Sequence, residues 1–284
     1  METENPKNQG SLYITATPIG NLEDITLRAL RILKEVDVIA AEDTRHTRKL
    51  LSHFEISTPL VSYYREKEQE RAVQLLERIA AGESVALVSD AGTPGISDPG
   101  AVLVRLAQQE GVNIVPIPGP SALATALSVS GITDSSFLFL GFAPSKKSQR
   151  KTLLTSLTDH PHPIIFYESP RRIQGLLKDI LEIMGDRKGF WGRELTKAHE
   201  DLQAGKISDL LERAEGGKNR GEFVLIVHPG DVTRAEGENL IELLTWYRDN
   251  TSLSLKDVSR KLASDLGLSR SAVYQDALKI YKKR

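Results

Sequence analysis

Two turns rich in glycine, proline and small polar residues are the most informative feature of this chain. The first covers residues 15–21, with the sequence Thr-Ala-Thr-Pro-Ile-Gly-Asn, and the second covers residues 89–100, which include three glycines and two prolines. Each turn follows an apolar run that predicts a β-strand. Glycine and proline gather at strand ends where the backbone passes close to a ligand or takes unusual dihedral angles. Because small molecules bind at strand ends of open α/β sheets, the pattern predicts a cofactor site.

A third turn repeats this pattern at the next predicted strand end, at residues 118–122 (Pro-Gly-Pro-Ser-Ala). Three consecutive strand ends of this kind favour one shared ligand, although the first turn by itself is compatible with an ordinary connection. The first turn lacks the G-x-G-x-x-G spacing of a dinucleotide site, and no Gly-Lys-Ser/Thr follows it as in a phosphate-binding loop. The sequence therefore disfavours these two classes of nucleotide site.

Candidate acid–base groups follow the predicted strand at 36–41. Glu42 and Asp43 stand there beside Arg45 and His46. Adjacent carboxylates on an extended strand cannot point the same way, so one can face the site while the other pairs with an arginine. A solvated turn with a local ion pair is the alternative interpretation, and His46 is better explained as a surface residue.

A second polar cluster follows the predicted strand at 188–193 and contains Arg193, Glu194, Lys197, His199 and Glu200. A lysine near a positively charged ligand can lose its proton more readily, because burial and neighbouring positive charge lower its pKa. Lys197 is therefore a candidate catalytic group, whereas His199 is better explained as a surface residue. The residues alone do not decide which group acts as the base.

The elements that must position these residues alternate between strands and helices. We expect strands at 12–16, 36–41, 85–89 and 113–117, separated by helices whose apolar stripes include Ile25 to Val36, capped by Asp24, and Ala72 to Ile79. This rhythm predicts a parallel sheet with crossover helices. We expect a flexible start at 1–10 and an N-terminal α/β domain at 11–142.

The pattern changes after residue 142. Residues 143–151 are predicted to form a basic, turn-rich connector at the domain boundary. A second, smaller α/β domain at 143–235 has strand candidates at 164–167, 188–193 and 221–227. From 236 to 284 the pattern is helical, with a turn at Gly267 and an N-cap at Ser269, and predicts a small bundle similar to a helix-turn-helix.

Composition excludes several classes of function. The chain has 284 residues, a formal net charge of −1 and no cysteine, so disulfides, thiolate metal sites and a cysteine nucleophile are excluded. The six histidines are scattered, and no metal site is predicted. No signal peptide and no membrane-spanning segment are expected, and the chain is predicted to be cytoplasmic.

Two basic segments indicate an RNA partner despite the neutral overall charge. The connector carries Lys146, Lys147, Arg150 and Lys151, and residues 252–284 contain eight Lys or Arg against three Asp. Arg171 and Arg172 are further candidate phosphate contacts. Such contacts add affinity without sequence information. A solvated linker and tail are the alternative interpretation.

Six motifs occur here in the order found in a known family. They are residues 17–22 (Thr-Pro-Ile-Gly-Asn-Leu), 41–45 (Ala-Glu-Asp-Thr-Arg), 89–94 (Ser-Asp-Ala-Gly-Thr-Pro), 118–121 (Pro-Gly-Pro-Ser), 166–172 (Phe-Tyr-Glu-Ser-Pro-Arg-Arg) and 193–197 (Arg-Glu-Leu-Thr-Lys). With them the chain resembles the ribosomal RNA small-subunit methyltransferase I family of the tetrapyrrole-methylase-like (class III) S-adenosylmethionine enzymes. The resemblance runs from about residue 11 to the end and weakens in the C-terminal bundle.

The resemblance implies two α/β domains that hold a folded S-adenosylmethionine in the cleft between them, usually in a homodimer. It implies 2′-O-methylation of a cytidine ribose in 16S rRNA of the small ribosomal subunit. By position in the motifs, the cofactor-binding residues would be Thr17, Ile19, Gly92, Thr93, Ile96, Ser121, Ala122, Tyr167 and Phe223. The catalytic candidates remain Glu42, Asp43, Arg45 and Lys197, with the base left open.

Two other functions are considered. Related enzymes methylate carbon in a tetrapyrrole precursor, but a small anionic macrocycle does not require a basic helical bundle. A regulator that binds duplex DNA through residues 268–284 and senses a metabolite is the non-enzymatic alternative.

Overall fold

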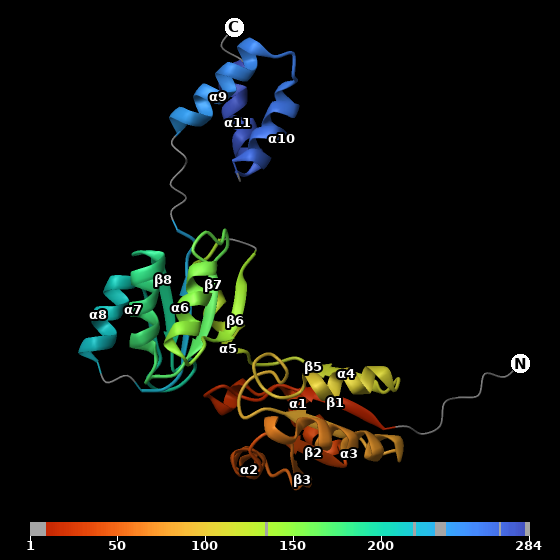
Figure 1. Cartoon of the computed structure of the whole chain (residues 1–284). Coiled ribbons are helices and arrows are strands. Elements are labelled where there is room, and N and C mark those ends of the chain that lie inside the picture. The colour runs from red at the N-terminus through yellow and green to blue at the C-terminus, as the bar shows by residue number, and fades with distance from the viewer. Residues whose placement is uncertain (1–9, 134–135, 218–219, 231–236, 267, 282–284) are drawn as a thin grey trace, which may run out of the picture. The chain divides into compact units, whose positions relative to one another are not determined.

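The computed structural model describes residues 10–133, 136–217, 220–230, 237–266 and 268–281. It divides into two compact units, Met1–Pro229 and Gly230–Arg284. The first unit contains two five-stranded sheets, and the second is helical (Figure 1).

The first sheet has the order β3-β2-β4-β1-β5, and all four strand pairs are parallel. Its strands are β1 (Ser11–Thr15), β2 (Val38–Ala41), β3 (Leu60–Ser62), β4 (Val85–Val88) and β5 (Asn113–Ile117). Parallel strands end at the same edge of a sheet. The turns that follow β1, β2, β4 and β5 therefore meet at one edge.

Helices cover both faces of this sheet. They are α1 (Leu27–Glu35), α2 (Thr44–His53), α3 (Glu68–Ala80) and α4 (Ala101–Gln109). Side chains of α3 and α4 pack with Leu12, Val38 and Leu87 on one face, whereas those of α1 and α2 pack with Ile39 and Val88 on the other. Strands buried on both faces need continuous apolar runs, which is why β2 and β4 have no polar residue.

The predicted cap of the first helix is wrong by two residues. Asp24 lies in a 3-10 turn (Leu22–Asp24), and the Asn21 side chain accepts a hydrogen bond from Glu23 N there. The α1 helix begins after Thr26, whose hydroxyl accepts a hydrogen bond from Ala29 N at 3.0 Å. Asp24 and Thr26 are both good caps by residue type, and the extra turn decides between them.

The second sheet has the order β6-β7-β10-β8-β9. Its strands are β6 (Leu138–Phe142), β7 (Ile164–Glu168), β8 (Lys188–Arg193), β9 (Asp201–Lys206) and β10 (Phe223–Val227). Only the β6–β7 pair is parallel, and the other three pairs are antiparallel. The central strand of this sheet, β10, is therefore the last to be added along the chain.

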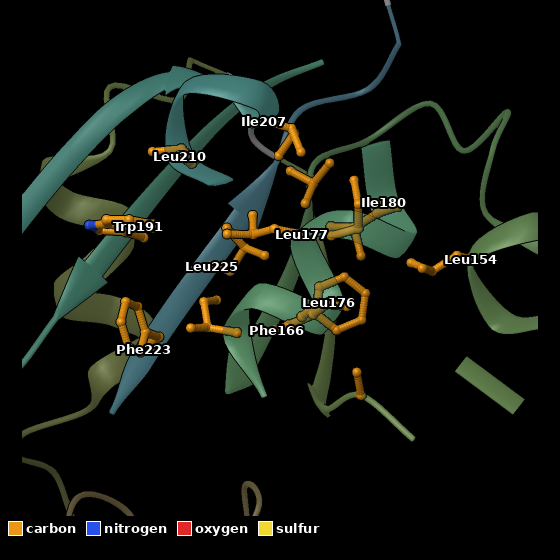
Figure 2. Close-up of a cluster of buried hydrophobic side chains, with 14 of the residues drawn as sticks. Leu154, Phe166, Leu176, Leu177, Ile180, Trp191, Ile207, Leu210, Phe223 and Leu225 are labelled. Carbon is orange, nitrogen blue, oxygen red and sulfur yellow. The ribbon is translucent and has the colours of Figure 1, made fainter. Parts of the chain in front are cut away.

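Three helices, α6 (Lys147–Ser156), α7 (Ile173–Met184) and α8 (Ile207–Gly216), supply side chains to the core on one face of the second sheet. Figure 2 shows Leu177 and Ile180 of α7 beside Phe166 and Leu225 of the strands. The other face is covered by α5 (Ala122–Val129), through Leu123, Ala126 and Leu127. Thus α5 follows the last strand of the first sheet but packs on the second.

This packing corrects two predictions about the region around residue 142. The predicted boundary places 138–142 in the N-terminal domain, yet β6 pairs with β7 of the second sheet. The predicted turn-rich connector at 143–151 is wrong from Lys147 onward, because α6 begins there. Leu154 and Leu157 supply the apolar stripe that holds this helix on the sheet, and both lie beyond the basic segment.

The second unit contains α9 (Gly237–Asn250), α10 (Leu255–Asp265) and α11 (Arg270–Tyr281). Its core joins Leu244, Val258, Leu262 and Val273. These helices agree with the predicted bundle, whereas the Gly267 turn and the boundary at 235–236 lie outside the described residues. Nowhere in the described ranges is a helix both long and apolar enough to cross a membrane.

Arg150 is a buried structural residue, which contradicts its predicted contact with RNA. Its side chain lies 2.6 Å from the Asp179 carboxylate, and the two residues are only 8% and 2% exposed. A guanidinium that is shielded from solvent and already paired has no access to a phosphate. Lys151 is also paired, with Glu182 at 2.6 Å, but on the surface.

We expect Arg150→Ala to lower the free energy of unfolding by about 3–5 kcal/mol, because it leaves the Asp179 charge buried without a partner. Lys151→Ala, which breaks an exposed pair, should cost no more than about 1 kcal/mol. Urea denaturation of the two variants measures the difference. Equal decreases in the free energy of unfolding of the two variants would contradict the structural role of Arg150.

Candidate active site

The first and second turns are joined by a short backbone bridge. Thr17 N donates to Gly92 O at 2.9 Å, and Gly92 N donates to Thr17 O at 3.0 Å. The Thr17 hydroxyl also donates to Ser89 O at 3.2 Å. Gly92 has a φ of +79°, a conformation that side chains rarely adopt. The bridge therefore explains both the glycine and the threonine in these turns.

Two further hydrogen bonds extend this arrangement to the third turn and the second sheet. The Thr93 hydroxyl donates to Pro120 O at 3.1 Å. Leu123 N, in the first turn of α5, donates to the Tyr167 hydroxyl oxygen at 3.1 Å. Since Tyr167 belongs to β7, these bonds connect strand ends of both sheets.

The end of the long second turn is held by Glu68 at the start of α3. Its carboxylate accepts hydrogen bonds from Gly100 N at 2.7 Å and from the Tyr63 hydroxyl at 3.2 Å. Gly100 has a φ of +146°, and a Cβ there would lie 3.0 Å from a Leu87 methyl group. The turn is thus tied at both ends, which fixes the backbone between them.

The three turns and the second sheet enclose a first cavity of about 260 Å³. It is lined by Ile19, Glu42, 90–93, 96–98, Ser121, Ala122, Phe142, Tyr167, Glu168, Gly192, Glu194, Leu195, Lys197 and 222–224. The volume lies slightly below the usual range for ligand pockets, so a bound molecule must be compact or extend beyond it.

Acidic side chains dominate the charge of this first cavity. Glu42, Asp90, Asp98 and Glu222 all line it. Burial, followed by the nearby Asp98 and Asp90 charges, raises the pKa of Glu42 to about 6. Burial and the Asp90 charge also raise the pKa of Asp98. A cationic ligand would relieve this repulsion, so the cavity is suited to a positively charged molecule.

A second cavity of about 700 Å³ adjoins the first. Ile19, Asp90, Ala91, Glu194, Lys197 and Glu222 line both cavities and form their shared wall. The remaining lining of the second cavity comes from the first turn, from Leu22, from α2, from Ser89 and from Gly221. Two ligands bound in the two cavities would meet at the shared wall.

The loop after β8 carries the polar part of this wall. Lys197 Nζ lies 2.7 Å from a Glu194 carboxylate oxygen, and Asn21 N donates to the Thr196 hydroxyl at 3.1 Å. Glycine is required where this loop approaches its neighbours, because a Cβ on Gly20 would lie 2.4 Å from the Lys197 side chain and one on Gly221 would lie 2.0 Å from the Glu194 carboxyl carbon.

The structure gathers all but one of the predicted cofactor residues around the first cavity. Ile19, Gly92, Thr93, Ile96, Ser121, Ala122, Tyr167 and Phe223 line it. Thr17 is the exception, because its side chain is buried and bonded to Ser89, and it lines the second cavity instead. Thr17 therefore holds two turns together.

Two of the four catalytic candidates line the first cavity and two do not, and the adjacent carboxylates Glu42 and Asp43 point in different directions, as expected after an extended strand. Glu42 and Lys197 line the first cavity. Asp43 accepts hydrogen bonds from the Arg45 side chain and caps α2, which holds the pKa of Asp43 well below its usual range. Asp43 and Arg45 line neither cavity, so this arrangement gives no support to their predicted catalytic role.

The basic candidates of the second sheet also differ in position. The Arg172 guanidinium lies 3.1 Å from the buried Glu168 carboxylate and also donates to Ala143 O, which makes it a structural residue. Arg171, Lys146 and Lys147 are exposed. They therefore remain available for a phosphate, unlike Arg150.

The sequence analysis missed the acidic character of the cavity. Asp90 and Asp98 lie within the second turn, but they were considered there for turn geometry and not for charge. Glu222 immediately precedes β10, and no motif in the sequence marks it as a site residue. An excess of carboxylates at several strand ends on one edge is the pattern that would have identified these residues.

Comparisons with known proteins agree with this geometry. The chain matches the family of Tetrapyrrole (Corrin/Porphyrin) Methylases over residues 11–211. The structure is similar to that of a cobalt precorrin-4 methyltransferase, with a TM-score of 0.59 and 20% sequence identity over 79% of this chain and 98% of that chain. The fold is therefore that of a tetrapyrrole methylase.

More similar relatives define the branch of this family. The chain is 41% identical to ribosomal RNA small subunit methyltransferase I of Halalkalibacterium halodurans over 278 residues, 94% of each chain. It is 47% identical to the Thermotoga maritima protein of the same name over 218 residues, 77% of this chain and 98% of that relative. The chain thus belongs to the ribosomal RNA small subunit methyltransferase I family.

The chain is a methyltransferase, and its methyl donor is S-adenosylmethionine. The first cavity fits this molecule chemically. Four carboxylates suit the positive charges of its sulfonium and ammonium groups, and Ile19, Ile96 and Phe223 offer apolar contacts for adenine.

We expect the affinity for S-adenosylmethionine to rise with pH through about 6. The ionised Glu42 attracts the cation and the protonated form does not, so binding lowers the pKa of Glu42 and releases part of a proton near pH 6. Glu42→Gln should weaken binding about tenfold at pH 7.5, which corresponds to ~1.4 kcal/mol, and remove the proton release.

Calorimetry at pH 5 to 8 in buffers of different ionisation enthalpy measures both quantities. Asp43→Asn is the matched control, because it neutralises the neighbouring carboxylate outside the cavity. Proton release that persists in Glu42→Gln would assign the titration to another group.

Proposed function

We propose that this protein methylates the 2′-hydroxyl of a cytidine ribose in 16S rRNA, acting on the small ribosomal subunit in the cytoplasm as a homodimer. Its N-terminal and second α/β domains form the catalytic unit, and the C-terminal helical bundle contributes to binding of the subunit. The relatives named as ribosomal RNA small subunit methyltransferases support this substrate.

One observation carries the proposal: an acidic cavity, which Glu42 lines, and a larger cavity share a wall that includes Asp90, Glu194, Lys197 and Glu222. A cationic methyl donor and a polyanionic acceptor need separate compartments that meet where the reaction occurs. When bound, S-adenosylmethionine supplies an electrophilic methyl group on a positively charged sulfur. The protein residues must then orient the acceptor hydroxyl and receive its proton.

Glu42 is the residue that we assign to receive the hydroxyl proton. A carboxylate whose pKa is raised to about 6 is ionised near neutral pH and is still basic enough to accept a proton. Lys197 is less suited to this role, because its Nζ is already paired with the Glu194 carboxylate at 2.7 Å. We therefore assign Lys197 to positioning the Glu194 loop at the shared wall.

Transfer of tritium from labelled S-adenosylmethionine to small subunits of a strain lacking the modification tests the reaction. We expect the label to enter 16S rRNA and to remain in a dinucleotide after alkaline hydrolysis, because a 2′-O-methyl group blocks strand cleavage at that ribose. Labelled nucleosides after complete digestion should contain a methylated cytidine.

The same assay includes the second enzymatic candidate. Label in a tetrapyrrole precursor but not in rRNA would favour carbon methylation of that precursor. Label found in mononucleotides after alkaline hydrolysis would place the methyl group on a base and contradict ribose methylation.

We expect Glu42→Gln to lower kcat at least about 100-fold, within the usual contribution of a general base. In the unmodified protein kcat/KM for S-adenosylmethionine should rise about tenfold per pH unit below about 6 and level off above it, because only ionised Glu42 attracts the donor and accepts the proton. A pH profile of kcat/KM for the donor measures this. An unchanged inflection in Glu42→Gln would exclude it as the base, and Asp43→Asn serves as the control.

A further inference from the structure

The two cavities differ in the charge of the residues that each has alone. The residues found only in the first cavity include Glu42, Asp98 and Glu168 and no cation, whereas those found only in the second include His46 and Lys49 and no carboxylate. Acidic and basic groups thus lie on opposite sides of the shared wall.

The basic side is built on α2, which contains Arg45, Arg48, Lys49 and two histidines but no acidic residue. Arg48 and Lys49 are exposed, and neither forms an ion pair with any residue in the part of the chain that the structure describes. Exposed cations without carboxylate partners remain available to an anionic ligand. His46 adds ring nitrogens that can donate a hydrogen bond to a phosphate.

The buried face of the same helix explains why these side chains reach the cavity. Thr47 and Leu51 are buried, and Leu51 belongs to the core beneath the first sheet. Residues 46 and 49 are three positions apart and therefore lie on one side of the helix. The packing of Leu51 thus directs His46 and Lys49 toward the first turn, and Leu22, which follows that turn, completes the lining.

We propose that the second cavity binds the acceptor nucleotide of a single-stranded RNA segment, with Lys49 and His46 contacting its phosphates and Leu22 its base or ribose. This assignment rests on the proposed function. The volume of about 700 Å³ is within the range for ligand sites, and the shared wall brings the nucleotide beside the donor. RNA-binding proteins usually recognise nucleotides that are splayed out of a helix, which a cavity of this kind accommodates.

The first test compares two variants, each of which removes one positive charge from α2. Lys49→Ala should raise KM for unmodified small subunits by about fivefold or more and change kcat less than about twofold, because a phosphate contact contributes to binding alone. Arg48→Ala is the matched control, since it removes the same charge from the same helix outside the cavity. It should change KM by less than about twofold. Equal effects of the two variants would overturn the cavity assignment.

The second test fills the cavity. Leu22→Trp places a larger side chain in the second cavity and none in the first, so kcat/KM for small subunits should fall about tenfold or more while the dissociation constant for S-adenosylmethionine stays the same. Leu27→Trp, at an exposed position of the adjacent α1 that lines neither cavity, is the steric control. Unchanged subunit methylation in Leu22→Trp, or a loss of donor affinity in Leu22→Trp or Lys49→Ala, would contradict the assignment.

Donor binding and methyl transfer by the unmodified protein separate the two proposals. Failure to methylate small subunits would contradict the proposed function. Normal methylation with no difference between each variant and its control would leave that function standing and remove only the role of the second cavity.

Discussion

The backbone bridge between Thr17 and Gly92 is the constraint on which the site depends. It joins the turns after β1 and β4, which are neighbouring strands, and thereby fixes where Ile19 and the 90–93 segment face the cavity. The hydrogen bond of Thr93 then joins the second turn to the third, and the hydrogen bond of Tyr167 joins α5 to the second sheet. A donor pocket can be rigid here because each turn is held by the next one.

The sequence predicts the first sheet well because its signals are local. Continuous apolar runs at β2 and β4 and the turn residues behind them fix strand positions without knowledge of the partner. It misses β3 and β9, which are both edge strands: β3 has only three half-buried residues, and β9 has no buried residue and includes three polar ones, Asp201, Gln203 and Lys206. Edge strands bury little, so their composition carries little signal.

In the candidate site, too, features that depend on local backbone geometry are predictable from the sequence, whereas features that depend on tertiary packing are not. Glycine and proline placement identified most of the residues around the first cavity, since backbone geometry determines those residue types. Charge could not be assigned in this way. Arg150 and Lys151 are adjacent in one basic segment, yet one is buried against Asp179 and the other lies on the surface. Only the packing of α6 on the sheet distinguishes them.

The order of strands has a consequence for synthesis on the ribosome. All five strands of the first sheet are available once residue 117 has emerged, so that domain can fold while the chain is still growing. The second sheet remains in two pieces until residue 227, because β10 lies between β7 and β8. During that interval the facing edges of β7 and β8 lack their partner. The newly made protein therefore acquires its methyl-donor pocket only near the end of translation.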